Sequence, residues 1–100
     1  MPEEEKEVTI IDRDFVTTYP TLREPHLVCL VTYTYEDRPA RVVEVDLTAL
    51  FGERAEEAKK QIEARQGDLW AKYLEAEAEA IRKDITSYEA RRPEVRRIRL

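Results

Sequence analysis

The only histidine and the only cysteine of the chain, His26 and Cys29, lie three residues apart. Imidazole and thiolate are metal ligands, and together they can also form a nucleophile with its general base. The residues around them alternate as in a β-strand, and positions i and i+3 of a strand point to opposite faces. We therefore expect Cys29 to be a small core residue and His26 to lie at the mouth of the strand. No metal site and no catalytic pair is predicted here.

Two carboxylates, Glu75 and Glu79, are spaced one helical turn apart, as in some divalent cation sites. Such sites normally recruit a histidine or further carboxylates from other helices, and this chain lacks them. A solvated helix face is the expected role. The sequence also contains no glycine-rich phosphate loop, no Ser/His/Asp set and no CxxC motif. We expect no enzyme, no cofactor and no small-molecule substrate.

Aromatic side chains could form a stacking platform for nucleic-acid bases. Their spacing follows strand and helix periodicity, which is more typical of core residues. We therefore expect most of them to be buried. The candidates are Tyr33, Tyr35, Trp70, Tyr73 and Tyr88.

The C-terminal ten residues carry five arginines against one glutamate, although the net charge of the whole chain is −5. Arginines in such a cluster can neutralise phosphates, which makes nucleic-acid binding an alternative function. The competing interpretation is that Arg97 and Arg99 pair across strands with Glu44 and Asp46. The candidate nucleic-acid contacts are Arg91, Arg92, Arg96, Arg97 and Arg99.

Composition indicates a habitat. Charged residues make up 39% of the chain, there is no asparagine, and glycine, serine and methionine are scarce. This profile is typical of heat-adapted proteins, and a computationally designed protein has a similar one. A single cysteine excludes an intramolecular disulfide framework and indicates a reducing compartment. Residues 1–6 are acidic, unlike a signal peptide, and we expect them to be frayed. The predicted location is the cytoplasm of a thermophile or of a cell infected by its virus, without a membrane partner.

The stretch from Leu50 to Arg92 is rich in helix formers, and Pro93 ends it. Residues 66–68, Gln-Gly-Asp, can break it, since Gly is a common residue after a helix and Asp is a good N-cap. A continuous helix from Glu53 to Arg92 would instead be about 60 Å long, too long for a domain of this size. We favour a continuous or gently kinked helix.

Residues 7–47 read as strands and a hairpin. Val8–Tyr19 is the first strand, with a candidate bulge near residues 12–14, and a proline-fenced loop covers 19–25. Leu27–Tyr35 and Arg41–Leu47 form the hairpin, and matching apolar parity pairs Tyr33 with Val43 and Val31 with Val45. A short turn capped by Thr48 and closed by Gly52 leads into the helix.

Residues 94–100 are the last candidate strand, which completes one domain of the α+β class with the order β-β-β-α-β. A small antiparallel or mixed sheet would pack on one long amphipathic helix.

Beyond Gly67 the apolar arc of this helix spans roughly 160°, wider than the arc of about 100° that a surface helix typically buries. We therefore expect a non-catalytic interaction or assembly protein that self-associates as a two-fold dimer. A small inhibitor or adaptor whose acidic surface docks on a basic partner is an alternative, as is a designed protein with no natural function. The predicted partner interface is Trp70, Leu74, Ile81, Ile85 and Tyr88.

Overall fold

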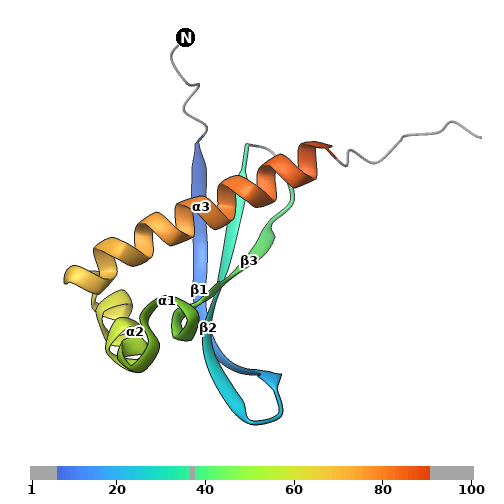
Figure 1. Cartoon of the computed structure of the whole chain (residues 1–100). Helices are drawn as coiled ribbons and strands as arrows, with labels where there is room; N and C mark the ends of the chain where they lie inside the picture. The colour runs from blue at the N-terminus through green and yellow to red at the C-terminus, as the bar shows by residue number, and fades with distance from the viewer. Residues whose placement is uncertain (1–6, 37, 91–100) are drawn as a thin grey trace, which may run out of the picture.

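The computed structural model of the chain describes residues 7–36 and 38–90, with side chains as far as Ser87. Three strands form an antiparallel sheet in the order β1-β2-β3. The helical segments follow, and α3 crosses one face of the sheet diagonally (Figure 1). The elements are β1 (Val8–Thr21), β2 (Glu24–Tyr35), β3 (Arg41–Asp46), α1 (Leu47–Phe51), the 3₁₀ turn η1 (Gly52–Arg54), α2 (Ala55–Ala64) and α3 (Asp68–Ala90).

The protein is a small α+β domain, as expected, but the predicted element order and the single long helix are wrong. The described order is β-β-β-α-α, with separate helices on either side of residues 65–67. The predicted strand at 94–100 lies outside the described residues.

The break between α2 and α3 has a local cause. Arg65 ends α2 in the left-handed conformation, and Gly67 has a φ of 115°, which a side chain rarely tolerates. The Gln61 side chain accepts hydrogen bonds from the backbone N–H groups of Leu69 (2.7 Å) and Trp70 (3.2 Å), which are otherwise unsatisfied at the start of a helix. A Cβ on residue 67 would lie 2.3 Å from Gln61 Oε1, so the corner requires glycine.

A slanted stripe of α3 faces the sheet. Four residues rotate a helix about 40° beyond a full turn, so residues spaced by four wind slowly around it. A helix that crosses a twisted sheet diagonally buries such a stripe (Figure 1). The wide apolar arc is therefore one narrow stripe whose direction changes along the helix, and its width does not require a second chain. The stripe is Leu69, Tyr73, Glu77, Ile81 and Ile85.

The loop predicted at 19–25 is also wrong. β1 continues to Thr21, a two-residue turn follows, and β2 begins at Glu24. The ladder has an irregularity between Thr18 and Thr21, and the two prolines lie in or beside it, where a missing N–H disrupts no regular pairing. The predicted bulge in β1 is present slightly earlier than expected, between Ile10 and Asp12.

The register predicted for the second hairpin is wrong by two residues. Val31 pairs with Val43, and Tyr33 pairs with Arg41. A slip of two residues preserves which side chains share a face, so apolar parity alone could not exclude it. The turn decides the register, because Glu36 has a φ of 54° and the Arg38 N–H donates to the Tyr35 carbonyl at 3.2 Å.

α1 begins differently from the prediction. The Asp46 carboxylate, rather than Thr48, caps it by accepting from the Ala49 N–H at 2.9 Å. Thr48 Oγ1 instead accepts from the Leu27 N–H at 2.8 Å and ties α1 to β2. Gly52 closes α1 as predicted, with a φ of 56°.

Candidate functional site

The two faces of the sheet have different neighbours. Arg13, Val31 and Val43 lie side by side on one face, which contacts the helices through Tyr73 and the rest of the α3 stripe. We call this the helix face. The alternate residues point to the opposite side, which no described helix crosses, and we call it the uncovered face. By the ladder pairing, the uncovered face consists of Thr9, Asp12, Asp14, Val16, Thr18, His26, Val28, Leu30, Thr32, Thr34, Val42, Glu44 and Asp46.

Apolar and acidic side chains alternate in rows across the uncovered face. Leu30 pairs with Asp14 on one side and with Glu44 on the other. In the rows above and below, Asp12, Thr32 and Val42 lie together, as do Val16, Val28 and Asp46. Val42 is 57% exposed. Val16 and Leu30 are half-buried, and Val28 is buried. The face is therefore a partly accessible apolar strip that carboxylates flank on both edges.

The formal charges that the described residues place on the uncovered face all have one sign. It carries four carboxylates, and the ladders place no lysine or arginine on it. The like charges lie two residues apart along each edge strand, Asp12 with Asp14 on β1 and Glu44 with Asp46 on β3, and like charges repel each other. This arrangement does not favour the stability of the isolated sheet. Asp12, Asp14 and Glu44 are exposed.

Asp46 differs from the other three carboxylates, because a histidine and the start of a helix hold it, whereas Asp14 accepts only from the N–H of its neighbour Phe15 at 3.0 Å. Its Oδ2 lies 2.6 Å from His26 Nδ1, and its Oδ1 caps α1. Burial raises the pKa of Asp46, but the hydrogen bonds from His26 and from the Ala49 N–H outweigh burial, and the pKa is lowered overall. His26 therefore has a structural role at the strand mouth.

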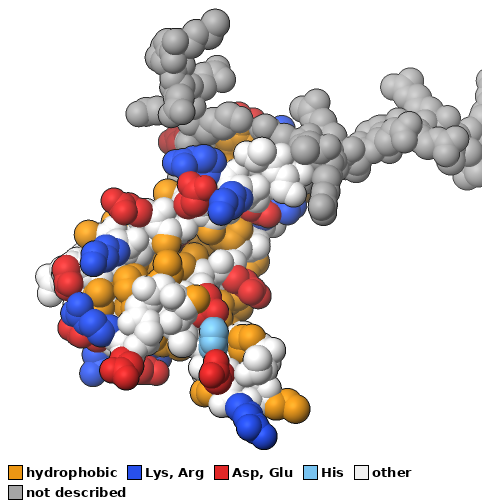
Figure 2. Space-filling view, in the orientation of Figure 1, with side chains coloured by type: hydrophobic (Ala, Val, Ile, Leu, Met, Phe, Trp, Pro, Cys, Tyr) orange, Lys and Arg blue, Asp and Glu red, His pale blue; other side chains and the backbone are white. Residues whose placement is uncertain are grey.

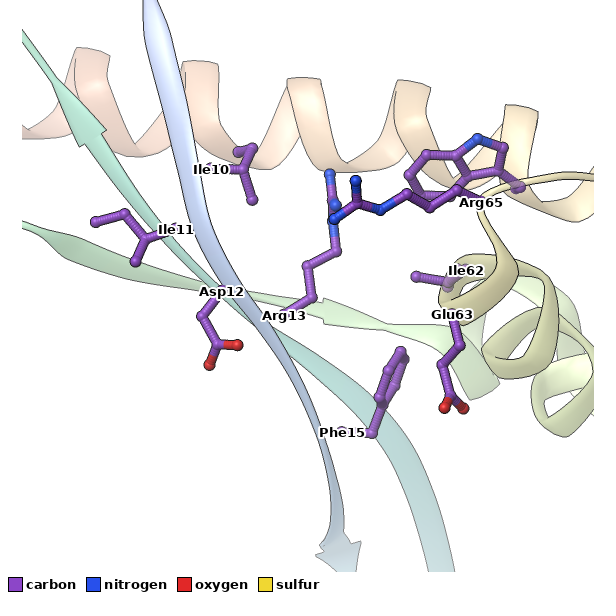
Figure 3. A pocket seen from close by; sticks show the side chains of 9 residues that line it. Ile10, Ile11, Asp12, Arg13, Phe15, Ile62, Glu63 and Arg65 are labelled. Carbon is purple, nitrogen blue, oxygen red and sulfur yellow. The ribbon is translucent and has the colours of Figure 1, made fainter.

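The helix face contains a cleft of about 630 Å³ between β1 and the corner that joins α2 to α3 (Figure 3). Arg13 and Arg65 point toward the same end of it, whereas the carboxylates of Asp12 and Glu63 point away (Figure 3). The lining residues are Ile10, Ile11, Asp12, Arg13, Phe15, Ile62, Glu63, Arg65 and Trp70.

Arg13 is fixed by a bidentate ion pair with Glu77 of α3. Its Nε and Nη2 donate to the two carboxylate oxygens at 2.6 and 2.8 Å, and these hydrogen bonds raise the pKa of Arg13. The Glu77 side chain is only 6% exposed. The Arg13 guanidinium lies 5.1 Å from the centre of the Trp70 ring and 6.0 Å from that of Tyr73. These contacts join β1 to α3 through one cation.

A second polar cluster links the far part of α3 to β3. Arg41 Nε donates to Asp84 at 2.8 Å, and the Tyr33 hydroxyl donates to the same carboxylate. The hydrogen bond from Arg41 is the main reason why the pKa of Asp84 is lowered, while burial raises the pKa of Tyr33 to about 12. Each buried polar group here has a partner, so the cluster is structural.

Cys29 is fully buried, and the Tyr73 hydroxyl donates to its Sγ at 3.3 Å. Burial raises the pKa of Cys29, so the group is a thiol, which is a poor nucleophile. His26 and Cys29 lie on opposite faces of the sheet, as predicted. No group of three or more potential metal ligands occurs among the described residues.

The predicted partner interface does not form one free surface. Ile81 and Ile85 are buried in the core of this chain, and Trp70 is half-buried against Arg13. Leu74 is 38% exposed, and the side chain of Tyr88 lies outside the described part of the chain. Figure 2 shows hydrophobic side chains at the surface between α3 and α1, with charged side chains around them.

The arginine cluster at 91–99 lies outside the described residues, so its pairing with Glu44 and Asp46 stays a prediction. Of the aromatic platform, Tyr33, Tyr35 and Tyr73 are core residues. Within residues 7–36 and 38–90, no helix is long and apolar enough to cross a membrane.

The sequence interpretation missed Arg13, Glu77 and Arg65. A signal for the first two exists, because Glu77 follows Tyr73 by one turn on the buried stripe, and a buried carboxylate needs a cationic partner. No comparable signal marks Arg65, whose position depends on the break before α3. Comparisons with protein-family models, characterised proteins and solved structures gave no significant match.

Proposed function

We propose that the protein is a non-catalytic interaction protein that receives a cationic, partly apolar surface of another protein on the uncovered face. The observation that carries this proposal is the apolar strip of that face, which is flanked by four carboxylates with no lysine or arginine among them. Leu30 between Asp14 and Glu44 is its centre. Complementary charge steers such an encounter, and the apolar strip supplies area to bury.

Charge complementarity also bears on the choice of partner. Two copies docked through their uncovered faces would bring carboxylates against carboxylates, which disfavours a two-fold dimer at this surface. Self-association through α3 has less support than the sequence suggested, because Ile81 and Ile85 are buried in the core of this chain and are not available to a second copy. An adaptor or inhibitor that binds a basic partner is therefore our preferred form of the interaction protein.

Nucleic-acid binding through the arginine cluster at 91–99 stays a weaker alternative. The acidic uncovered face would repel phosphates. The same cluster could also occupy the uncovered face within one chain. We retain the proposal of a heat-adapted cytoplasmic protein from composition alone.

The test is a titration at low salt, in which the full chain is added to a fluorescently labelled short peptide of alternating lysine and leucine. The fluorescence anisotropy of the peptide measures binding. We expect saturable binding. Removing two of the carboxylates, with Asp14→Asn and Glu44→Gln together, should weaken binding about fivefold, since two exposed charge pairs at about 0.5 kcal/mol each contribute about 1 kcal/mol.

A matched control separates the site from the overall charge of the chain. Glu56 and Glu75 are exposed on α2 and α3, so Glu56→Gln with Glu75→Gln changes the net charge equally. This double variant should bind the peptide as the unmodified chain does. Equal weakening by both double variants would contradict the proposal, as would tight binding of duplex DNA without peptide binding. If Arg96→Ala with Arg97→Ala strengthens peptide binding, the arginine cluster competes for the same face.

A further inference from the structure

We propose that the cleft between β1 and the α2–α3 corner binds a small organic anion, a carboxylate attached to an aromatic or other apolar body. This site lies on the helix face, so the inference is independent of the function proposed for the uncovered face. The volume of about 630 Å³ falls within the range of about 300–1,000 Å³ that is usual for small-molecule sites.

The apolar part of the ligand has a suitable surface in the cleft. Ile10, Phe15 and Ile62 line it, and each is at least half-buried beside the core. Trp70 adds a half-buried indole to the same lining. These four side chains give the cleft one apolar wall, while the rest of its lining is largely polar.

The charged part of the ligand would meet two guanidinium groups. Arg13 and Arg65 point toward the same end of the cleft (Figure 3). Glu77 takes the Nε and Nη2 of Arg13 and leaves its Nη1 outside that pair. Arg65 has no carboxylate partner among the described residues. A planar carboxylate can accept two parallel hydrogen bonds from an arginine guanidinium, a geometry that no other cationic side chain offers.

The lining acids do not cancel this positive end. The carboxylates of Asp12 and Glu63 point away from it in Figure 3. Lys59 does not contribute to this end, since its Nζ lies 5.5 Å from the centre of the Phe15 ring, and Phe15 lies away from the two guanidinium groups (Figure 3). Glu77 balances the charge of Arg13, so the net positive charge at the arginine end is that of Arg65, and Arg13 contributes a free N–H donor there.

The corner holds its parts rigidly before any ligand arrives. The Gln61 side chain caps the first turn of α3, which carries Trp70. Gly67 has no Cβ, so its backbone can lie close to the Gln61 side chain. Arg65 adopts the left-handed conformation with a φ of 55°, a costly choice for a residue with a side chain. Preorganised groups lose less entropy when a ligand binds.

The experiment uses the single tryptophan as a local reporter. The full chain is titrated with 2-naphthoate and, separately, with its neutral isostere 2-naphthamide, while the indole N–H resonance of Trp70 and the methyl resonances of Ile62 are followed. We expect saturable shifts with 2-naphthoate and at least about tenfold weaker binding of the amide, because one charge-assisted hydrogen bond contributes that factor or more.

Arg65→Gln should weaken 2-naphthoate binding by about tenfold or more, and the exposure of Arg65 predicts an unchanged melting temperature. Arg82→Gln is the matched control, because Arg82 is 71% exposed on α3 and is not among the cleft residues. It should leave binding unchanged.

Four results would overturn the proposal. The first is equal binding of the acid and the amide, which would show that only apolar contact matters. The second is equal weakening by Arg65→Gln and Arg82→Gln, which would point to net charge. The third is the absence of saturation, and the fourth is a set of shifts confined to residues outside the cleft.

Discussion

Neighbouring residues of β1 serve two chemically opposite surfaces. Asp12 and Asp14 lie on the uncovered face, whereas Arg13 points to the helix face and pairs with Glu77. On the uncovered face Asp12, Asp14 and Glu44 are exposed, and none of them forms an ion pair within the described part of the chain, whereas Asp46 is held by His26. The helix face buries its charges in pairs and clusters with defined hydrogen bonds. Because successive side chains of a strand point to opposite faces, one strand can contribute both to a surface suited to a cationic partner and to a cleft suited to an anion.

The two surfaces also differ in what they contribute to stability. Charges on the helix face are partly or largely buried, so removing one member leaves its partner unpaired. On the uncovered face, the charges of Asp12, Asp14 and Glu44 are solvated, so their removal costs little. Substitutions at the two surfaces should therefore differ greatly in the free energy of unfolding, although all of them change a single charge.

The largest effect should follow Glu77→Gln, which leaves the half-buried Arg13 guanidinium without a countercharge. We expect a loss of about 3 kcal/mol in the free energy of unfolding, measured by urea denaturation. Glu75→Gln on the exposed side of the same helix should change it by less than about 0.5 kcal/mol. Replacing the pair, with Arg13→Met and Glu77→Leu, should restore much of the loss. A Glu77→Gln variant as stable as Glu75→Gln would remove the distinction between the two surfaces.

The next effect concerns the corner that shapes the cleft. Gly67→Ala introduces a Cβ that would clash with the Gln61 side chain at a positive φ, and we expect a loss of about 2 kcal/mol. Gly52 also has a positive φ, but a Cβ there meets no atom within 4 Å. Gly52→Ala should therefore cost only about 1 kcal/mol. Equal losses in thermal denaturation would show that Gln61 does not constrain the corner.

A smaller effect is the dependence of stability on pH. The pKa of Asp84 is lowered in the folded state, mainly by the hydrogen bond from Arg41. Its contribution is fully present above the unfolded pKa of about 3.9 and is lost as the pH falls through the folded value. Asp84→Asn should cost about 2 kcal/mol near neutral pH and much less near pH 2. Urea midpoints of both proteins across that range provide the measurement, and a constant difference would exclude this linkage.

The smallest effect should come from the uncovered face. Asp14→Asn and Glu44→Gln should each change the free energy of unfolding by less than about 0.5 kcal/mol, and the sign should favour the variants. Chemical denaturation at low salt would reveal it. A clear destabilisation by either variant would mean that these carboxylates have stabilising partners, and the arginines at 91–99 would be the first to consider.

The sequence predicted the parts of the fold that depend on local pattern. Alternation in β2 and β3 assigned the faces correctly, and Gly52 marked the end of α1. What it missed depends on distant contacts. The break before α3 relies on the Gln61 side chain reaching Leu69 and Trp70, and the hairpin register relies on a turn at Glu36.

The candidate sites were harder to predict than the fold. Glu44 and Asp46 could be recognised from the sequence as acidic residues of β3. That Glu44 lies opposite Asp14, with Leu30 between them, could not be predicted without the correct strand register. The cleft could not be predicted without the break between α2 and α3, because Arg13 and Arg65 are far apart in sequence and only the corner brings them together. The wide apolar arc misled the interpretation, because a helical projection discards position along the axis and a slanted stripe then resembles a broad one.

The most direct test of this division is a methyl-resolved spectrum of the full chain during titration with the lysine–leucine peptide. The methyl groups of Leu30 and Val42 report on the uncovered face, and those of Ile10 and Ile62 report on the cleft. We predict saturable shifts for the first pair with the second pair unchanged. Shifts of Ile10 and Ile62, with Leu30 and Val42 unmoved, would contradict the assignment of a cationic partner to the uncovered face.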